Sequence, residues 1–468
     1  MKKLFKPITL WLAALIPVAL VLLFFEADLL WKVQQHNVFL HTASFFRQMM
    51  AVPGGMLSYL GAFFTQHFFL PWVGTIMLCA WWLLLMWMTR RAFHVAERWT
   101  VLTLIPVALL LVANMDMGYW VYFMKLPGYF YVATLGWAAA TALLWAFRCL
   151  PENRWIHCAF ILLTVVAGYP LLGAYALAAA TLMGVMAWRM PIARSSRILL
   201  TIVALLSIVA VPLLYYRFVY VATNISDIYR AAIPVYMVAE SYPEYYIPYY
   251  ALAVCFLLMA VTYRQEHAQH KASLLTAYIM PLACCVVLAA GVWHFWYKDA
   301  NFHHELRMQR CIEQADWEGV VEEGTKQNGE PTRAIVMMHN LALSRLGRQC
   351  DEMYDFPKGS KKANTPLPVF MFNVVGPMML YQYGAMNECH RLCMEEGVEY
   401  GWNVEQLKYL ARAAIFNKEP QAARKFLDIL RKTWYDRGWA DHMEALLGDP
   451  KQLAMDSETG PITHMMHY

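Results

Sequence analysis

Two carboxylates stand immediately after the first long apolar run of the chain. The run covers residues 7–25, and Glu26 and Asp28 follow it. A carboxylate at a membrane surface can act as a general base or hold a divalent cation beside a lipid-linked phosphate. In a helix these two positions point about 200° apart, and Asp28 has Lys32 at the spacing of a helical ion pair. We predict Glu26 and Asp28 as candidate catalytic residues and assign no metal.

Three further ionisable residues are candidates, because burying charge at membrane depth is costly. Asp116, near the end of the third apolar run, is a third candidate catalytic carboxylate. Arg217 and Arg230 are candidate phosphate-binding residues, since guanidinium groups bind phosphate through paired N–H donors; contact with lipid headgroups is the alternative. The sequence contains no P-loop, no Gly-x-Ser-x-Gly and no His-Glu-x-x-His, and it identifies no cofactor.

The composition indicates that one part of the chain contacts lipid and another part contacts water. Of 468 residues, 60% are hydrophobic and 15% charged, whereas about a quarter of a soluble protein is charged. Nearly all long uncharged runs precede residue 296, so the first part of the chain needs lipid and the remainder needs water. The net charge of +5 is modest, and we predict no nucleic-acid partner.

The apolar runs predict an all-α protein with a polytopic transmembrane domain over residues 1–296. A bilayer core of about 30 Å requires roughly 20 apolar residues in a helix. No small-residue cleavage site follows the first run, so we expect it to remain as a helix. About nine spans are predicted, at residues 7–25, 68–88, 99–114, 127–147, 155–170, 172–189, 197–215, 247–263 and 273–295.

The basic residues predict the orientation. Lys and Arg concentrate in one set of connecting segments, as in cytoplasmic loops. The predicted inner segments contain Lys2, Lys3, Lys6, Arg90, Arg91, Arg98, Arg148, Arg154, Arg189, Arg194, Arg197, Arg264 and Lys271. We therefore expect a bacterial inner (plasma) membrane protein with a cytoplasmic N-terminus. An odd number of spans places the C-terminal domain in the periplasm, and one miscounted span reverses that side.

Two predicted outer loops are long. The loop at residues 26–67 is expected to form a juxtamembrane helix over Asp28–Met50, a break at Pro53-Gly54-Gly55 and a second short apolar helix. His36 and His41 fall on the polar part of the first helix and are expected at the membrane interface. The loop at residues 216–246 is rich in tyrosine, which favours the lipid–water boundary.

Residues 297–468 predict a soluble domain of short amphipathic helices. Phe372-Asn373-Val374 recurs as Trp402-Asn403-Val404, and two later helices are expected to begin 34 residues apart, the period of a tetratricopeptide repeat. We predict a tetratricopeptide-like helical-repeat domain. Stacked helix pairs leave a concave face, which is suited to a protein partner.

Two resemblances bear on the class of protein. The segment Pro53-Gly54-Gly55-Met56-Leu57-Ser58-Tyr59-Leu60-Gly61, followed by Phe68-Phe69-Leu70-Pro71-Trp72-Val73-Gly74, resembles an uncharacterised family of multi-pass membrane proteins, a domain of unknown function in Bacteroidota. In layout, the chain also resembles the polytopic (GT-C-like) glycosyltransferases that use polyprenyl-phosphate sugars. That resemblance implies an acidic residue just after the first span, the place of Glu26 and Asp28, and a juxtamembrane helix at Asp28–Met50.

Two functions fit these observations. The first is a transferase that takes a polyprenyl-phosphate-linked sugar at the outer face of the membrane, where Glu26 or Asp28 activates the acceptor and Arg217 or Arg230 neutralises the phosphate. The second is a non-enzymatic scaffold whose helical-repeat domain docks an envelope protein. Membrane lipid is an expected partner in both cases. A polar pocket lined by acidic residues would distinguish the transferase from the scaffold.

Overall fold

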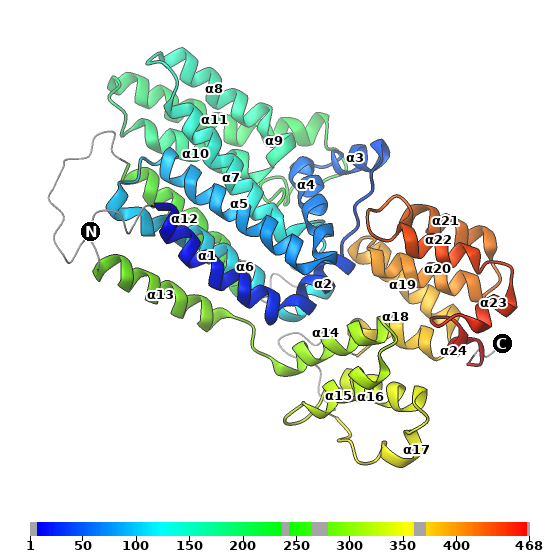
Figure 1. Ribbon diagram of the computed structural model, residues 1–468. Coiled ribbons are helices and arrows are strands. Elements are labelled where there is room, and N and C mark those ends of the chain that lie inside the picture. The colour runs from blue at the N-terminus through cyan, green and yellow to red at the C-terminus, as the bar shows by residue number, and fades with distance from the viewer. Residues whose placement is uncertain (1–6, 236–242, 264–278, 360–370, 466–468) are drawn as a thin grey trace.

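The computed structural model describes residues 7–235, 243–263, 279–359 and 371–465. All regular elements in these ranges are helices (Figure 1). The described residues between 7 and 296 form a bundle of apolar helices, here called the apolar bundle. The described residues between 297 and 465 form a group of shorter helices, the C-terminal region, which packs against one end of the bundle.

The elements of the apolar bundle, with η for a 3-10 helix, are α1 (Pro7–Phe24), α2 (Ala27–Gln35), α3 (Ala43–Met49), α4 (Gly55–Thr65), η1 (Gln66–Phe69), α5 (Pro71–Ala92), η2 (Glu97–Thr103), α6 (Leu104–Met115), η3 (Gly118–Tyr122), α7 (Tyr129–Arg148), α8 (Arg154–Val166), α9 (Gly168–Leu172), α10 (Ala174–Ala187), α11 (Arg194–Phe218), η4 (Pro243–Tyr246), α12 (Ile247–Val261) and α13 (Met280–Phe295). Those of the C-terminal region are α14 (Ala300–Glu313), α15 (Trp317–Thr325), α16 (Arg333–Arg345), α17 (Gln349–Glu352), α18 (Met371–Gln382), α19 (Met386–Tyr400), α20 (Val404–Phe416), α21 (Pro420–Leu430), α22 (Arg437–Ala445), α23 (Pro450–Met455) and α24 (Gly460–Thr463).

Fewer of the described helices than the predicted nine are long and apolar enough to cross a membrane. Five qualify, and a sixth is added if α13 and α14, which meet at 72°, count as one broken span. Three other predicted spans form helices of 10–17 residues. Local breaks account for two of them: α8 ends at Val166, and Gly173, with φ +58°, separates α9 from α10. The five long stretches are Pro7–Phe24, Pro71–Ala92, Tyr129–Arg148, Arg194–Phe218 and Glu244–Val261.

The outer faces of several bundle helices are apolar. On α11, Leu205 and Leu206 are 59% and 64% exposed, and on α13 Val286 and Val287 are 60% and 69% exposed. Continuous exposed apolar surface of this extent is typical of proteins that contact a membrane. Together with the five long apolar helices, it indicates a membrane protein.

Helix α7 forms the centre of the bundle and packs against α4, α5 and α10. Tyr131 donates a hydrogen bond to the Gly74 carbonyl at 2.7 Å, and Trp82 donates to Thr134 Oγ1 at 3.2 Å. Gly128, which begins the helix with φ +65°, lies so close to α4 that a Cβ there would be 2.0 Å from the Ala62 nitrogen. A glycine is required for this approach, and it fixes the η3–α7 loop against α4.

The first long loop differs from the expectation of one helix over Asp28–Met50. It contains two short helices, α2 and α3, separated by residues 36–42. The hydroxyl of Thr42 accepts a hydrogen bond from the Phe45 amide at 3.2 Å and so caps α3, an arrangement that starts a new helix. The predicted break at Pro53-Gly54-Gly55 is confirmed: Gly54 has φ +75°, and α4 follows as the second apolar helix.

The described part of the second long loop, residues 219–235, folds back on the bundle. Tyr169 donates a hydrogen bond to the Ile228 carbonyl at 2.7 Å, and the Ala174 amide donates to the Ala231 carbonyl at 2.9 Å. The loop is thereby attached to α9 and the start of α10. Residues 236–242 of this loop lie outside the described ranges.

Consecutive helices of the C-terminal region pack against one another from α14 to α16 and from α18 to α22. Side-chain caps begin several of them: Asp316, Thr332 and Asn403 each accept a hydrogen bond from a backbone amide three residues later. Helices α19 and α21 begin 34 residues apart, at Met386 and Pro420. Helical packing is confirmed, whereas a tetratricopeptide-type repeat stays a prediction.

Candidate functional site

Glu26 lies at the junction between the apolar bundle and the C-terminal region. Its side chain is only 3% exposed. Oε1 accepts a hydrogen bond from Trp296 Nε1 at 2.7 Å, and Oε2 lies 3.8 Å from His303 Nδ1. Burial raises the pKa of Glu26, and the neighbouring His303 opposes that shift. The side chain therefore joins α2 to the α13–α14 segment.

Asp28 is held by two arginines of α14. Its Oδ2 lies 3.2 Å from Arg307 Nε, and its Oδ1 lies 2.9 Å from Arg310 NH1. Both carboxylate oxygens are engaged, so Asp28 in this arrangement attaches α14 to α2.

Lys32 does not form the predicted ion pair with Asp28. Its side chain is 1% exposed, and its Nζ lies 2.7 and 2.9 Å from the two carboxylate oxygens of Glu405. Gln309 accepts a further hydrogen bond from Nζ at 2.9 Å and donates one to the Tyr122 hydroxyl. A helical spacing gives only a weak preference, and the distant carboxylate of α20 outcompetes Asp28.

These contacts form one continuous polar junction, here called the polar seam. From the apolar bundle it contains Glu26, Asp28, Lys32, Tyr119 and Tyr122, and from the C-terminal region His303, Glu305, Arg307, Gln309, Arg310 and Glu405. Ionic groups of both parts satisfy each other across it. The seam holds the two parts in a defined relative position.

A cleft of about 430 Å³ opens beside the seam, between the apolar bundle and the C-terminal region. Small-molecule sites have volumes of about 300–1,000 Å³. Five segments form its walls: the end of α2 with α3, the η3–α7 loop, the start of α18, the α19–α20 connection and α21. The lining residues include His36, Asn37, Phe45, Gln48, Tyr122, Phe123, Lys125, Asn373, Glu396, Tyr400, Trp402, Asn403, Gln406 and Phe426.

The cleft contains a carboxyl group that can exchange a proton near neutral pH. Burial raises the pKa of Glu396 to about 7, and the negative charge of Glu405 adds to the shift. Burial alone would raise the pKa of Glu405 too, but Lys32 and His36 hold it well below its usual range. His36 lies 2.9 Å from Glu405, and burial lowers the His36 pKa. The cleft therefore combines a protonatable acid, an ionised acid behind it and a neutral imidazole.

Aromatic rings and one lysine occupy the rim of the cleft. Phe123 and Tyr400 have ring centroids 5.5 Å apart, and Lys125 Nζ lies 5.8 Å from the Tyr400 ring centroid. Lys125 also pairs with the exposed Glu399 at 3.2 Å. Apolar rings next to a cation and an acid can bind an amphipathic ligand that carries both hydroxyl and phosphate groups.

The other predicted site residues lie apart from the cleft. Asp116 follows α6, and burial, with a smaller contribution from Glu244, raises its pKa to about 6. Its neighbour Met115 accepts a hydrogen bond from the Tyr297 amide at 3.3 Å. Arg217 and Arg230 are exposed, at the end of α11 and in the loop on α9 and α10. The structure thus brings together Glu26 and Asp28 but not the two arginines.

Sequence reasoning did not single out the residues of the cleft. Glu396 is one of several acids on an amphipathic helix, and His36 was expected only at the membrane interface. The one available signal was the echo Trp402-Asn403-Val404, because Trp402 and Asn403 line the cleft. Within the described ranges, no three His, Cys, Asp or Glu side chains are placed to hold a metal ion.

Comparison with known proteins identifies a family whose function is unknown. No curated protein and no solved structure matches the chain. The model of a family of unknown function (DUF6057) matches residues 3–468. The predicted resemblance to an uncharacterised family is confirmed at this level, without its assignment to Bacteroidota. The chain belongs to this family of unknown function over nearly its whole length.

Proposed function

We propose that the protein is a membrane-bound transferase that uses a polyprenyl-phosphate-linked sugar and binds it in the cleft. The observation that carries the proposal is the position of Glu396, a carboxyl with a pKa of about 7, in a cleft where the apolar bundle meets the C-terminal region. A general base works best with a pKa near the working pH. A donor whose tail dissolves in lipid would reach this cleft from the surface of the bundle.

In this mechanism Glu396 activates the acceptor. Its carboxylate accepts the proton of an acceptor hydroxyl while that oxygen bonds to the anomeric carbon of the sugar. The bond from the anomeric carbon to the phosphate oxygen breaks, and polyprenyl phosphate leaves. Lys125 at the rim neutralises the phosphate charge, and Tyr400 and Trp402 stack against the sugar. The role predicted for Glu26 and Asp28 passes to Glu396, and the two former residues hold the polar seam.

The proposal includes the predicted topology. Eight described apolar stretches, namely the five long ones and the three shorter ones, precede α13. Counted with α13 they would give nine crossings, and an odd number puts the two ends of the chain on opposite sides of the membrane. With a cytoplasmic N-terminus, the C-terminal region and the cleft would lie outside a bacterial inner membrane. The inner segments would then carry most of the Lys and Arg.

The test uses the full-length protein in mild detergent and a synthetic polyprenyl-phosphate-linked hexose. Native mass spectrometry should show retention of this lipid, and Lys125→Ala should weaken retention about fivefold, since one basic residue contributes about 1 kcal/mol to binding an anionic headgroup. Arg154→Ala, which removes an exposed cation outside the cleft, is the matched control and should have no effect.

Turnover is measured separately, as release of polyprenyl phosphate in the presence of an envelope extract that supplies acceptors. Glu396→Gln should lower the rate by at least about a hundredfold, the usual loss for a general base, without reducing lipid retention. Glu395→Gln, an exposed neighbour that pairs with Arg391, should behave like the wild type. Retention of no lipid-linked hexose by the wild type, or equal rates for Glu396→Gln and Glu395→Gln, contradicts the transferase.

A non-enzymatic scaffold is the second proposal, and the polar seam favours it. The seam uses Glu26 and Asp28 to fasten the C-terminal region in place, as a docking platform for another envelope protein would require. A scaffold predicts that a second polypeptide, and no lipid-linked sugar, stays with the purified protein. It also predicts that Glu396→Gln leaves that association intact.

A further inference from the structure

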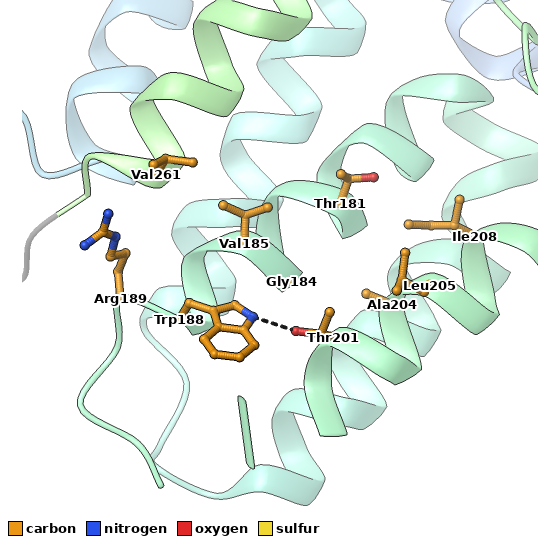
Figure 2. Close-up of a pocket in the computed structure, with 10 residues that line it drawn as sticks. All are labelled: Thr181, Gly184, Val185, Trp188, Arg189, Thr201, Ala204, Leu205, Ile208 and Val261. Atoms are coloured by element: carbon orange, nitrogen blue, oxygen red, sulfur yellow. Dashed lines mark hydrogen bonds between the residues drawn. The ribbon is translucent and has the colours of Figure 1, made fainter. Parts of the chain in front are cut away.

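A second cavity lies in the apolar bundle, between α10, α11 and the end of α12 (Figure 2). Its volume is about 430 Å³. In Figure 1 the end of α12 and the α10–α11 connection lie at the end of the bundle away from the C-terminal region, so this cavity is at that end. It is therefore separate from the cleft. The lining residues are Thr181, Gly184, Val185, Trp188, Arg189, Thr201, Ala204, Leu205, Ile208 and Val261.

The cavity is a groove between two antiparallel helices. Gly184 faces Ala204 so closely that a Cβ on the glycine would lie 3.3 Å from the Ala204 Cβ. Small residues at this crossing leave the groove open above them. Figure 2 shows Trp188 hydrogen-bonded to Thr201, at 2.9 Å, near the end of the groove. The remaining lining is mostly apolar, which suits a hydrocarbon chain.

Positive charge gathers at one end of the groove. Arg189 is exposed and lies beside Val261 there (Figure 2), and no ion pair within the described residues engages it. Arg197, one turn before Thr201 on α11, donates to the Met190 carbonyl at 3.1 Å, and its buried Nε has no hydrogen-bond partner in the described part of the chain. No Asp or Glu occurs between Glu152 and Asp227. The cations at this end therefore lack a neutralising carboxylate from this stretch of the chain.

We propose that this groove binds one anionic phospholipid. An acyl chain lies between α10 and α11 over Gly184 and Ala204, and the phosphate contacts Arg189. Charge complementarity selects an anionic headgroup over a zwitterionic one. The open apolar groove selects a lipid over a free phosphate ion. The site does not depend on the proposed transferase activity.

The experiment compares two lipids that differ only in headgroup. Full-length protein in mild detergent is titrated with phosphatidylglycerol or phosphatidylcholine of identical acyl chains, and bound lipid is measured by native mass spectrometry. The wild type should retain phosphatidylglycerol more tightly. Arg189→Ala should weaken that binding about fivefold, as expected for one basic residue near a headgroup, and should weaken phosphatidylcholine binding less, because the choline cation already neutralises that headgroup.

Two further variants distinguish binding of the acyl chain from binding of the headgroup. Thr181→Phe places a ring at the exposed rim of the groove and should reduce binding of both lipids. Arg154→Ala, on α8 and outside the groove, should change neither. Equal retention of the two lipids by the wild type overturns the proposal, and so does Arg189→Ala behaving like Arg154→Ala. Displacement of phosphatidylglycerol by inorganic phosphate at millimolar concentration would identify a simple anion site and also overturn it.

Discussion

Replacement of Lys32 by methionine tests whether the polar seam holds the C-terminal region on the apolar bundle. The Lys32 side chain is 1% exposed and bonds to Glu405 and Gln309 at 2.7–2.9 Å. Its loss leaves the Glu405 carboxylate without its main cation. Breaking a buried ion pair costs about 3–5 kcal/mol, and because the Glu405 side chain is 20% exposed we expect the lower end, about 3 kcal/mol.

The assay is hydrogen exchange of the α2 and α14 amides in the full-length protein. A loss of about 3 kcal/mol, at 1.4 kcal/mol per factor of ten, predicts opening of the seam about a hundredfold more often. Lys125→Met is the matched control, because Lys125 pairs with Glu399 at the surface, where both side chains are more than 40% exposed. That pair should contribute less than about 1 kcal/mol.

The double variant Lys32→Met with Glu405→Gln, together with the two single variants, completes a double-mutant cycle. Removal of both charges leaves no unpaired ion, so exchange should return most of the way to the wild-type rate. The reasoning fails if Lys32→Met accelerates exchange no more than Lys125→Met does. It also fails if the double variant is as destabilised as the two single changes added together.

Three other predictions concern stability. The pKa of Glu396 is raised to about 7 from 4.5, so its contribution to stability is full below pH 4.5 and is lost as the pH rises through 7. The melting temperature of Glu396→Gln should therefore be higher than that of the wild type at pH 8 and equal to it at pH 4.5. Asp28→Asn weakens contacts with two partly exposed arginines and should speed α14 exchange about fivefold, for about 1 kcal/mol. Gly128→Ala, at φ +65° and against the α4 backbone, should cost about 3 kcal/mol or more in thermal unfolding, whereas Gly438→Ala, in open space on α22, should stabilise by up to about 1 kcal/mol.

The parts of the fold that depend on local patterns could be predicted from sequence. Apolar runs gave the positions of the bundle helices, and the Pro53-Gly54-Gly55 break was found because glycine marks a positive φ. The expected helix over Asp28–Met50 was wrong because Thr42 caps a second helix, a local signal that the apolar pattern outweighed. The shortness of two spans likewise depends on particular breaks between α8 and α10, such as Gly173, within continuous apolar sequence.

The candidate site could not be predicted, because its parts are far apart in the chain. Lys32 and Glu405 meet across the seam, and nothing in either segment marks the other as its partner. The pattern around Asp28 favours a local ion pair that the folded protein does not form. In the sequence Glu396 resembles any acid on a solvated helical face, and its raised pKa results from burial and from the charge of Glu405.

The titratable groups of the polar seam and of the cleft are electrostatically coupled. Lys32 keeps Glu405 ionised, and the Glu405 charge in turn contributes to the raised pKa of Glu396. Lys32 also acts on Glu396 directly and in the opposite sense, because its positive charge lowers the Glu396 pKa. Burial is the largest cause of the raised pKa of Glu396. The carboxyl therefore has a pKa of about 7 because of its position in the cleft, and a change that exposes it to water would return the pKa toward that of an ordinary glutamate.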